Sequence, residues 1–199
     1  MLAYLRAMRM FAALVPPPQA VEDLDEFLAP RRESGSFRWA LPEQFHVTLA
    51  FLAEVADPQL DELVERLTRA AKRRTPFPVR ITGGGAFPNA GRARVIWAGL
   101  DLDEHGHTEL SRMATGARAA ASKSGIAVDG QRFKAHLTLA RLGRPAEVSR
   151  WVRLLDAYQG PAWTADRIAL VASYLGEGPR GRPRYETVEE FPLAPRIPG

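Results

Sequence analysis

Short apolar runs alternate with amphipathic stretches along this chain. In the longer stretches the apolar residues recur every three or four positions, the period of a helix with one buried face. Helices are predicted at residues 19–31, from 57 through at least 67, at 108–124 and at 146–158. Strands are predicted at residues 10–15, 37–40, 46–52, 77–82, 94–100, 136–142, 167–175 and 185–191. Apart from the short strand at 37–40 and the final edge strand at 185–191, each half of the chain therefore follows the order strand, helix, strand, helix, strand.

One heptapeptide occurs twice, on the middle strand of each half. His46-Val47-Thr48-Leu49-Ala50-Phe51-Leu52 matches His136-Leu137-Thr138-Leu139-Ala140-Arg141-Leu142 at five of seven positions, in a chain with four histidines. Internal repeats of this kind indicate a repeated architecture. We expect an α+β fold with two pseudo-symmetric lobes of antiparallel β-sheet, helices packed outside them and a central cleft. A single bilobal domain is expected over residues 8–199, with repeat halves at roughly 8–85 and 86–199 and an extension at 1–7.

Two glycine-containing segments join the predicted elements. Gly83-Gly84-Gly85 predicts a flexible turn between the halves, because no Gly-Lys-Ser/Thr sequence follows it to form a phosphate loop. Residues 176–183 form a Gly/Pro/Arg loop that is either solvated or placed beside a substrate.

Composition restricts the class of protein. The chain has 199 residues, of which 46% are hydrophobic and 25% charged, as in an ordinary folded domain. It has no cysteine, which excludes disulfides, thiolate metal sites and a cysteine nucleophile. No run approaches the roughly 18 apolar residues of a membrane helix, so we expect a cytoplasmic protein with no membrane partner.

The charge balance favours an anionic ligand. The net charge is +4, and only three of the 27 basic residues are lysine, so the rest are arginine. Arginine binds phosphate through two parallel hydrogen bonds. A GC-rich genome also enriches arginine, so the composition alone does not identify RNA as the partner.

The repeated motif carries the candidate chemistry. Residues two apart on a strand share a face, so His46 projects with Thr48, and His136 with Thr138. A cleft between the lobes would bring both pairs to one centre. One imidazole can then act as base and the other as acid, while the hydroxyls bind phosphoryl oxygens.

The histidines have two alternative interpretations. A purely structural role is common for one histidine on an apolar strand, but not for the same motif in both halves. Two histidines and two threonines without a carboxylate make a poor metal site, so no metal or cofactor is expected. His105 and His107 are interpreted as exposed residues at the start of a helix.

The doubled motif resembles that of the two-histidine phosphoesterase superfamily, and in particular the bacterial and archaeal RNA 2′,3′-cyclic phosphodiesterases, also called 2′-5′ RNA ligases. The similarity extends over nearly the whole chain. Further family-like positions are residues 8–14, Trp39 and residues 42–46, 85–88, 94–99 and 191–193. Ala135 departs from the pattern, because relatives more often have proline before the second histidine.

The resemblance implies metal-independent hydrolysis of a 2′,3′-cyclic phosphate to a 2′-phosphomonoester. We expect a monomer that acts on RNA or oligonucleotide ends. It implies that His46 is the proton donor and His136 the proton acceptor, and that Thr48 and Thr138 bind the phosphoryl oxygens. A 2′-5′ RNA ligase, a 2′-5′ phosphodiesterase, another cyclic nucleotide phosphodiesterase on the same fold and a non-catalytic RNA-binding module remain alternatives.

Other residues are weaker candidates. Arg141 is a candidate phosphate contact, although simple strand alternation points it and Phe51 away from the motif face. Trp39, Phe45 and Phe133 could stack on a base, but core packing is the favoured interpretation for each.

Overall fold

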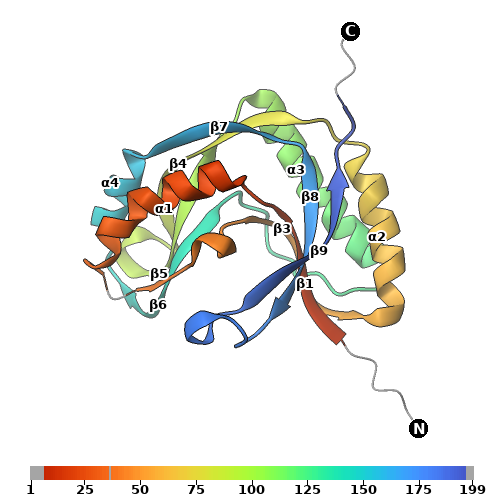
Figure 1. Ribbon diagram of the computed structural model, residues 1–199, viewed down its shortest axis with the longest axis horizontal. Helices are drawn as coiled ribbons and strands as arrows, with labels where there is room; N and C mark the ends of the chain where they lie inside the picture. Colours follow the sequence, from red (N-terminus) through yellow and green to blue (C-terminus); the bar gives the residue numbers. More distant parts are fainter. Residues whose placement is uncertain (1–6, 36, 196–199) are drawn as a thin grey trace.

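The computed structural model describes residues 7–35 and 37–195 (Figure 1). Within these ranges the chain forms four α-helices, nine strands and three short 3₁₀ turns. The helices are α1 (Pro18–Arg32), α2 (Asp57–Ala71), α3 (Glu104–Lys123) and α4 (Ser149–Asp156). The strands are β1 (Ala7–Leu14), β2 (Arg38–Trp39), β3 (Val47–Ala56), β4 (Phe77–Phe87), β5 (Ala93–Asp101), β6 (Leu137–Ala146), β7 (Gln159–Ala165), β8 (Arg167–Tyr174) and β9 (Arg184–Pro192). The extension expected at residues 1–7 lies outside the described residues except for Ala7, which begins β1.

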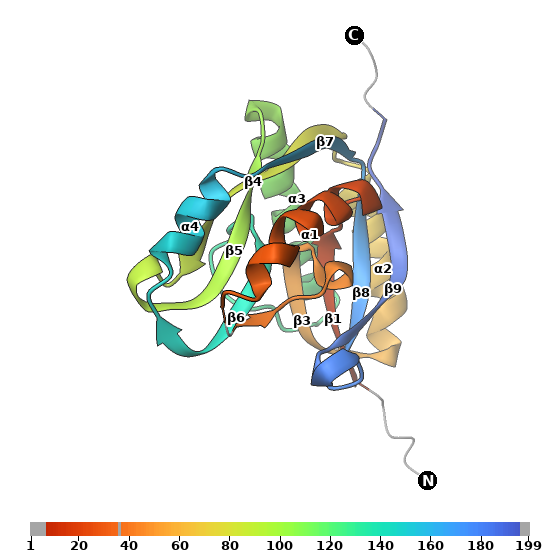
Figure 2. The same ribbon diagram turned by 60° about the vertical axis from the view of Figure 1, so that its left-hand side comes forward.

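The strands form one curled antiparallel sheet in the order β7-β4-β5-β6-β3-β1-β8-β9, with β2 added beside β6. We call β3, β1, β8 and β9 the β3 lobe, and β6, β5, β4, β7 and β2 the β6 lobe. Helices α2 and α3 pack together against the β3 lobe, while α1 and α4 pack against the β6 lobe (Figures 1 and 2). The predicted α+β fold with two antiparallel lobes is confirmed.

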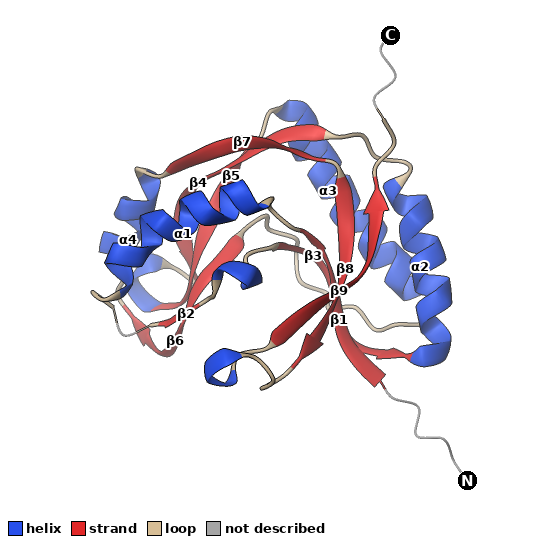
Figure 3. Ribbon diagram, in the orientation of Figure 1, coloured by secondary structure: helices blue, strands red, loops and turns tan. Residues whose placement is uncertain are grey.

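The last strand of each sequence half lies in the other half's lobe. Strand β4 follows α2 along the chain but pairs with β5, and β8 follows the second half's helices but pairs with β1. Strands that occupy equivalent places in the two lobes also occupy equivalent places in the two sequence halves. The equivalent pairs are β3 with β6, β1 with β5, and β4 with β8. The pseudo-symmetry therefore holds, although each lobe combines strands from both halves (Figure 3).

The predicted helical stripes form the core. Leu24, Leu63, Leu67, Leu110 and Leu155 are all at most 1% exposed. Burial of each such leucine contributes about 1.5–3 kcal/mol to folding. The helices thus attach to the sheet through the residues that their 3.6-residue period selects.

The glycine run is not a turn between the halves, which corrects the prediction. Gly83, Gly84 and Gly85 lie inside β4, where an added Cβ on Gly84 would meet Leu155 at 2.5 Å and one on Gly85 would meet Trp97 at 2.2 Å. Glycine is required because the helix α4 side chain and the indole lie directly on this strand.

One helix boundary and one strand also differ from the prediction. Strand β6 continues to Ala146, so α4 begins only at Ser149. Strand β7 was not predicted, because Gly160 and Pro161 interrupt its pattern. It lies at the sheet edge, where a proline without an N–H donor is tolerated.

Candidate active site

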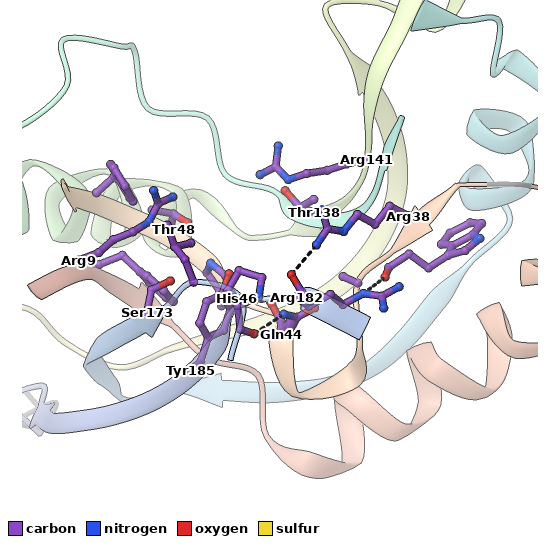
Figure 4. Close-up of a pocket in the computed structure, with 18 of the residues that line it drawn as sticks. Arg9, Arg38, Gln44, His46, Thr48, Thr138, Arg141, Ser173, Arg182 and Tyr185 are labelled. Carbon is purple, nitrogen blue, oxygen red and sulfur yellow. Dashed lines mark hydrogen bonds between the residues drawn. The ribbon is translucent and has the colours of Figure 1, made fainter. Parts of the chain in front are cut away.

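A cavity of about 450 Å³ lies between the two lobes and is lined by both motifs (Figure 4). His46, Thr48, His136 and Thr138 all face it. Strands β3 and β6 place them there by pairing at Val47 and Leu137, the residues that directly follow the two histidines. The predicted central cleft and the meeting of the two motifs are confirmed.

Each imidazole ring is held by a hydrogen bond to the backbone carbonyl two residues before it. The Nδ1 atom of His46 lies 2.7 Å from the carbonyl oxygen of Gln44, and Nδ1 of His136 lies 2.7 Å from that of Lys134. A carbonyl oxygen can only accept, so each Nδ1 is the N–H donor. The remaining nitrogen, Nε2, is therefore left to accept or donate a proton in the cavity.

Aromatic side chains fix the planes of the two rings. Phe11 stacks on His46 with a centroid distance of 4.4 Å and an interplanar angle of 22°, and Tyr185 meets the same ring edge-on at 5.5 Å. Phe87 contacts His136 edge-on at 4.9 Å, and Trp97 lies at 6.2 Å. The two histidines therefore have the same anchor but different ring contacts.

Burial lowers the pKa of both histidines. The pKa of His46 falls to about 4, chiefly because burial disfavours the charged ring, with the charges of His136 and Arg141 adding to the effect. The pKa of His136 is also lowered, first by burial and then by the charges of Lys134 and Arg141. Both rings are consequently neutral at pH 7 in the free protein.

Two β-bulges at equivalent positions add a further residue to each motif face. Ala12 pairs with Ala50 and Ala13 with Thr48, so Leu49 is an extra residue in β3. An extra residue interrupts the alternation, and both Leu49 and Ala50 are buried. Phe51 therefore lies on the same face of β3 as Thr48 and lines the cavity.

The second bulge does the same for Arg141. Ile96 pairs with Ala140 and Trp97 with Thr138, so Leu139 is the extra residue in β6. Arg141 therefore lines the cavity together with Thr138. The expectation that alternation turns Phe51 and Arg141 away from the motif face is wrong, because it assumed a regular strand.

The three aromatic candidates for base stacking are placed differently. Phe45 is 2% exposed and belongs to the core, and Phe133 packs against the core without lining the cavity. Trp39 lines the cavity, but its ring also packs on Phe37 and Trp151. Core packing is the favoured interpretation for all three and is confirmed, since Trp39 and Phe45 are buried core residues and Phe133 packs against the core; Trp39 in addition lines the cavity.

Several cavity residues were missed by the sequence analysis: Arg9, Phe11, Arg38, Gln44, Ser173 and Tyr185. They come from β1, β2, the turn at Pro42–Gln44, β8 and β9. Arg9, Phe11 and Gln44 lie in the family-like segments 8–14 and 42–46 but were given no role, and Arg38, Ser173 and Tyr185 belong to no motif. The loop at residues 176–183 does lie beside the cavity, as one of its two interpretations held, through Gly176, Gly181, Arg182 and Pro183. Its glycine and arginine content was the available signal.

The other histidines lie away from this site. His105 and His107 are in the first turn of α3, as predicted. His107 is exposed, but His105 is half-buried beside the hydroxyl of Thr75, which corrects the expectation that both are exposed. Among residues 7–35 and 37–195, no three histidine, aspartate or glutamate side chains gather as metal ligands. Over the same residues, no helix is both long and apolar enough to cross a bilayer.

The chain matches known proteins over most of its length. A family model described as LigT like Phosphoesterase matches residues 14–97 and 100–180. A Thermus thermophilus protein named RNA 2′,3′-cyclic phosphodiesterase is 32% identical over 192 residues, covering 94% of this chain and 90% of the relative. An Aquifex aeolicus protein of the same name is 31% identical over 159 residues, covering 78% of this chain and 81% of the relative.

Solved structures have the same fold. A crystal structure of a protein from Thermus thermophilus superposes with a TM-score of 0.75 at 30% identity, covering 96% of this chain and all of the other. E. coli LigT in its apo form superposes with a TM-score of 0.74 at 24% identity, covering 94% of this chain and 98% of the other.

Proposed function

The chain belongs to the LigT-like phosphoesterase family, and we propose that it is an RNA 2′,3′-cyclic phosphodiesterase that works by acid–base catalysis between His46 and His136. The observation that carries this proposal is the pair of imidazoles, each anchored through Nδ1 to a backbone carbonyl and each facing one cavity with a threonine of its own motif. Both rings are oriented, and both have Nε2 free for proton transfer.

In the proposed reaction, water attacks the phosphorus of the cyclic phosphate while Nε2 of His136 takes its proton. The bond from phosphorus to the 3′ oxygen breaks, and Nε2 of His46 donates a proton to that oxygen. The products are a 2′-phosphomonoester and a free 3′-hydroxyl. His136 then carries the additional proton and His46 has lost one, and exchange with solvent restores both.

Anion stabilisation comes from three other side chains in this proposal. The hydroxyls of Thr48 and Thr138 donate hydrogen bonds to the non-bridging oxygens, and the Arg141 guanidinium binds the same phosphoryl group. Acid, base and anion binding are thus all supplied by side chains, and no metal or cofactor has a role.

The pKa values of the two histidines fit a mechanism in which the bound substrate promotes protonation of His46. The lowered pKa of His136 suits a neutral base at pH 7. The pKa of His46 is about 4 in the free protein, so the ring becomes protonated at pH 7 only when a negative charge lies beside it. An anionic phosphoryl group beside the ring favours the imidazolium form. The backbone anchors are alike, so the choice of donor and acceptor rests on the family resemblance.

The proposal extends to a monomer that acts on RNA ends in the cytoplasm. Residues of one chain form both motif faces of the cavity, so catalysis needs no partner copy. The absence of cysteine suits a reducing compartment such as the cytoplasm, and the surplus of arginine over lysine suits a phosphate-bearing ligand.

The decisive test is hydrolysis of an RNA oligomer ending in a 2′,3′-cyclic phosphate, in excess EDTA, with the 2′- and 3′-phosphate products resolved. Wild type should give the 2′-phosphate. His46→Ala and His136→Ala should each lose about 10²–10⁴-fold in kcat, the usual contribution of a general acid or base. Near-wild-type turnover by either variant, a 3′-phosphate product or inhibition by EDTA would contradict the mechanism. His107→Ala, an exposed histidine outside the site, is the matched control.

A further inference from the structure

Three arginines, on two paired strands and a loop, line the same cavity. Arg38 on β2 is the direct cross-strand partner of Arg141 on β6, and Arg182 enters from the loop before β9 (Figure 4). Like charges directly opposite one another on a sheet are destabilising. Among the described residues, no carboxylate oxygen lies within 4.0 Å of a guanidinium nitrogen of these three. The cluster therefore has no ion-pair partner among these residues, and the nearest opposing charge, Glu43, acts on Arg182 only from a longer distance.

Arg182 is the most costly of the three to place there. It is 8% exposed, and its Nε donates a 3.0 Å hydrogen bond to the carbonyl oxygen of Trp39. Burial lowers its pKa, the charges of Arg180 and Arg38 lower it further, and only the carboxylate of Glu43 opposes them. A buried cation without an ion-pair partner is destabilising until an anion reaches it.

The loop that carries Arg182 is fastened to the segment that positions His46. Arg38 Nη2 donates to the Gly181 carbonyl oxygen at 3.0 Å, and Gln44 Nε2 donates to that of Pro183 at 2.9 Å. The carbonyl of the same Gln44 accepts from His46 Nδ1. Arg38 and Arg182 are thus held at a set place relative to the reacting imidazole.

Charge matching indicates more than one phosphate in this cavity. A cyclic phosphate and a backbone phosphodiester each carry one negative charge, whereas the three guanidiniums carry three positive charges. Arg141, directly after the second motif, serves the reacting phosphate in the proposed function. Arg38 and Arg182 lie beyond it and remain without an anion.

We propose that Arg38 and Arg182 bind the phosphodiester on the 5′ side of the reacting nucleotide, so that the enzyme recognises an RNA chain and not only its cyclic end. This subsite rests on the proposed function of the cavity. The cavity volume is suited to a ligand of about nucleotide size. The next phosphate of the chain would accordingly lie at its rim, where Arg38 is exposed.

The test compares three substrates that share one reacting group: a nucleoside 2′,3′-cyclic phosphate, its 5′-phosphorylated form, and a dinucleotide with the same cyclic end. Arg38→Gln and Arg182→Gln should each lose about tenfold more kcat/KM on the dinucleotide than on the nucleoside, as expected when a charged hydrogen bond is removed. Arg180→Gln removes a charge from the same loop outside the cavity and should show no such difference.

The other outcomes overturn the subsite. Equal losses on all three substrates would place the two arginines at the reacting phosphate. A selective loss only on the 5′-phosphorylated nucleoside would indicate a free nucleotide as ligand, not an RNA backbone. No loss in either variant would remove both arginines from binding.

Two measurements separate a folding defect and a failure of the function. Thermal unfolding shows whether Arg182→Gln is folded. If it is not, the subsite is tested with Arg38→Gln, because Arg38 is exposed and its substitution leaves the core unchanged. Affinity for the dinucleotide and nucleoside 2′-phosphates is measured on the same variants. If wild type hydrolyses none of the substrates, the proposed function fails, whereas the subsite still stands or falls on whether the dinucleotide loses more affinity than the nucleoside.

Discussion

Val47 and Leu137 are paired across the sheet, and in the described part of the chain they are the only paired position between β3 and β6. Each is the second residue of its motif. Continuing this antiparallel register by one residue in each direction places His46 across from Thr138, and His136 across from Thr48. This register sets each histidine position across from the threonine position of the other motif, and one backbone pairing brings all four residues to the same cavity.

This relationship predicts that the junction is important for stability. Leu137 is fully buried, so Leu137→Ala should lower the free energy of unfolding by about 2–5 kcal/mol through lost burial and the cavity it leaves. Urea denaturation measures the effect. Val188→Ala on the partly exposed edge strand β9 is the control and should stay within about 0.5 kcal/mol of wild type. Equal effects would contradict a central role for the β3–β6 junction.

The motif hydroxyls are expected to act as donors to the phosphoryl group. Thr48→Val and Thr138→Val keep the shape of the side chain and remove the hydroxyl, so each should lower kcat by about 10²-fold or more, as loss of an oxyanion donor does. Thr→Ser at the same positions restores the hydroxyl and should restore most of the rate. If valine and serine variants lose the same activity, the threonines act through packing only.

Arg141 should be required because the bulge at Leu139 turns it into the cavity. Arg141→Gln should lower kcat/KM by about tenfold or more, since it removes a charge-assisted contact to phosphate. Arg144→Gln, on the same strand but outside the cavity, is the matched control. A loss of similar size in both variants would indicate a general charge effect and not a specific contact.

Stability should depend on pH in a defined direction. The folded-state pKa of both motif histidines lies below the ordinary value of 6.5, and for His46 it is about 4. Between these values the unfolded chain binds more protons than the native one, so stability falls as pH falls from about 6.5 towards 4. Urea midpoints at pH 7 and pH 5 should therefore differ, and the difference should shrink in His46→Gln. An unchanged difference would show that His46 is not held neutral.

The glycine run should not tolerate side chains. An added methyl group at Gly85 meets the Trp97 ring, so Gly85→Ala should cost about 1–3 kcal/mol, the usual penalty of overpacking. At Gly143 a Cβ meets nothing within 4 Å, so Gly143→Ala should be close to neutral. Thermal unfolding of the two variants provides the comparison.

The elements with a clear period could be predicted from the chain itself. Leu63 and Leu67 repeat at helical spacing and are buried, and the two motifs alternate as strands. Residues 83–85 and 159–165 could not be placed in the same way, since glycine and proline usually end strands. Their strand conformation depends on partners distant in sequence, namely Trp97, Leu155 and the neighbouring strands.

The amino-acid sequence by itself determined the two His-x-Thr motifs, their common face and the repeated order of elements, because these depend on side-chain period and local sequence. Only the tertiary structure decided that Leu49 and Leu139 are bulges, that Arg141 faces the cavity, and that Arg38 and Arg182 join it from separate segments. The physical reason is that bulge position, strand exchange and loop placement are set by pairing between distant segments. The sequence around Arg38 and Arg182 does not predict which strands lie beside them in the fold.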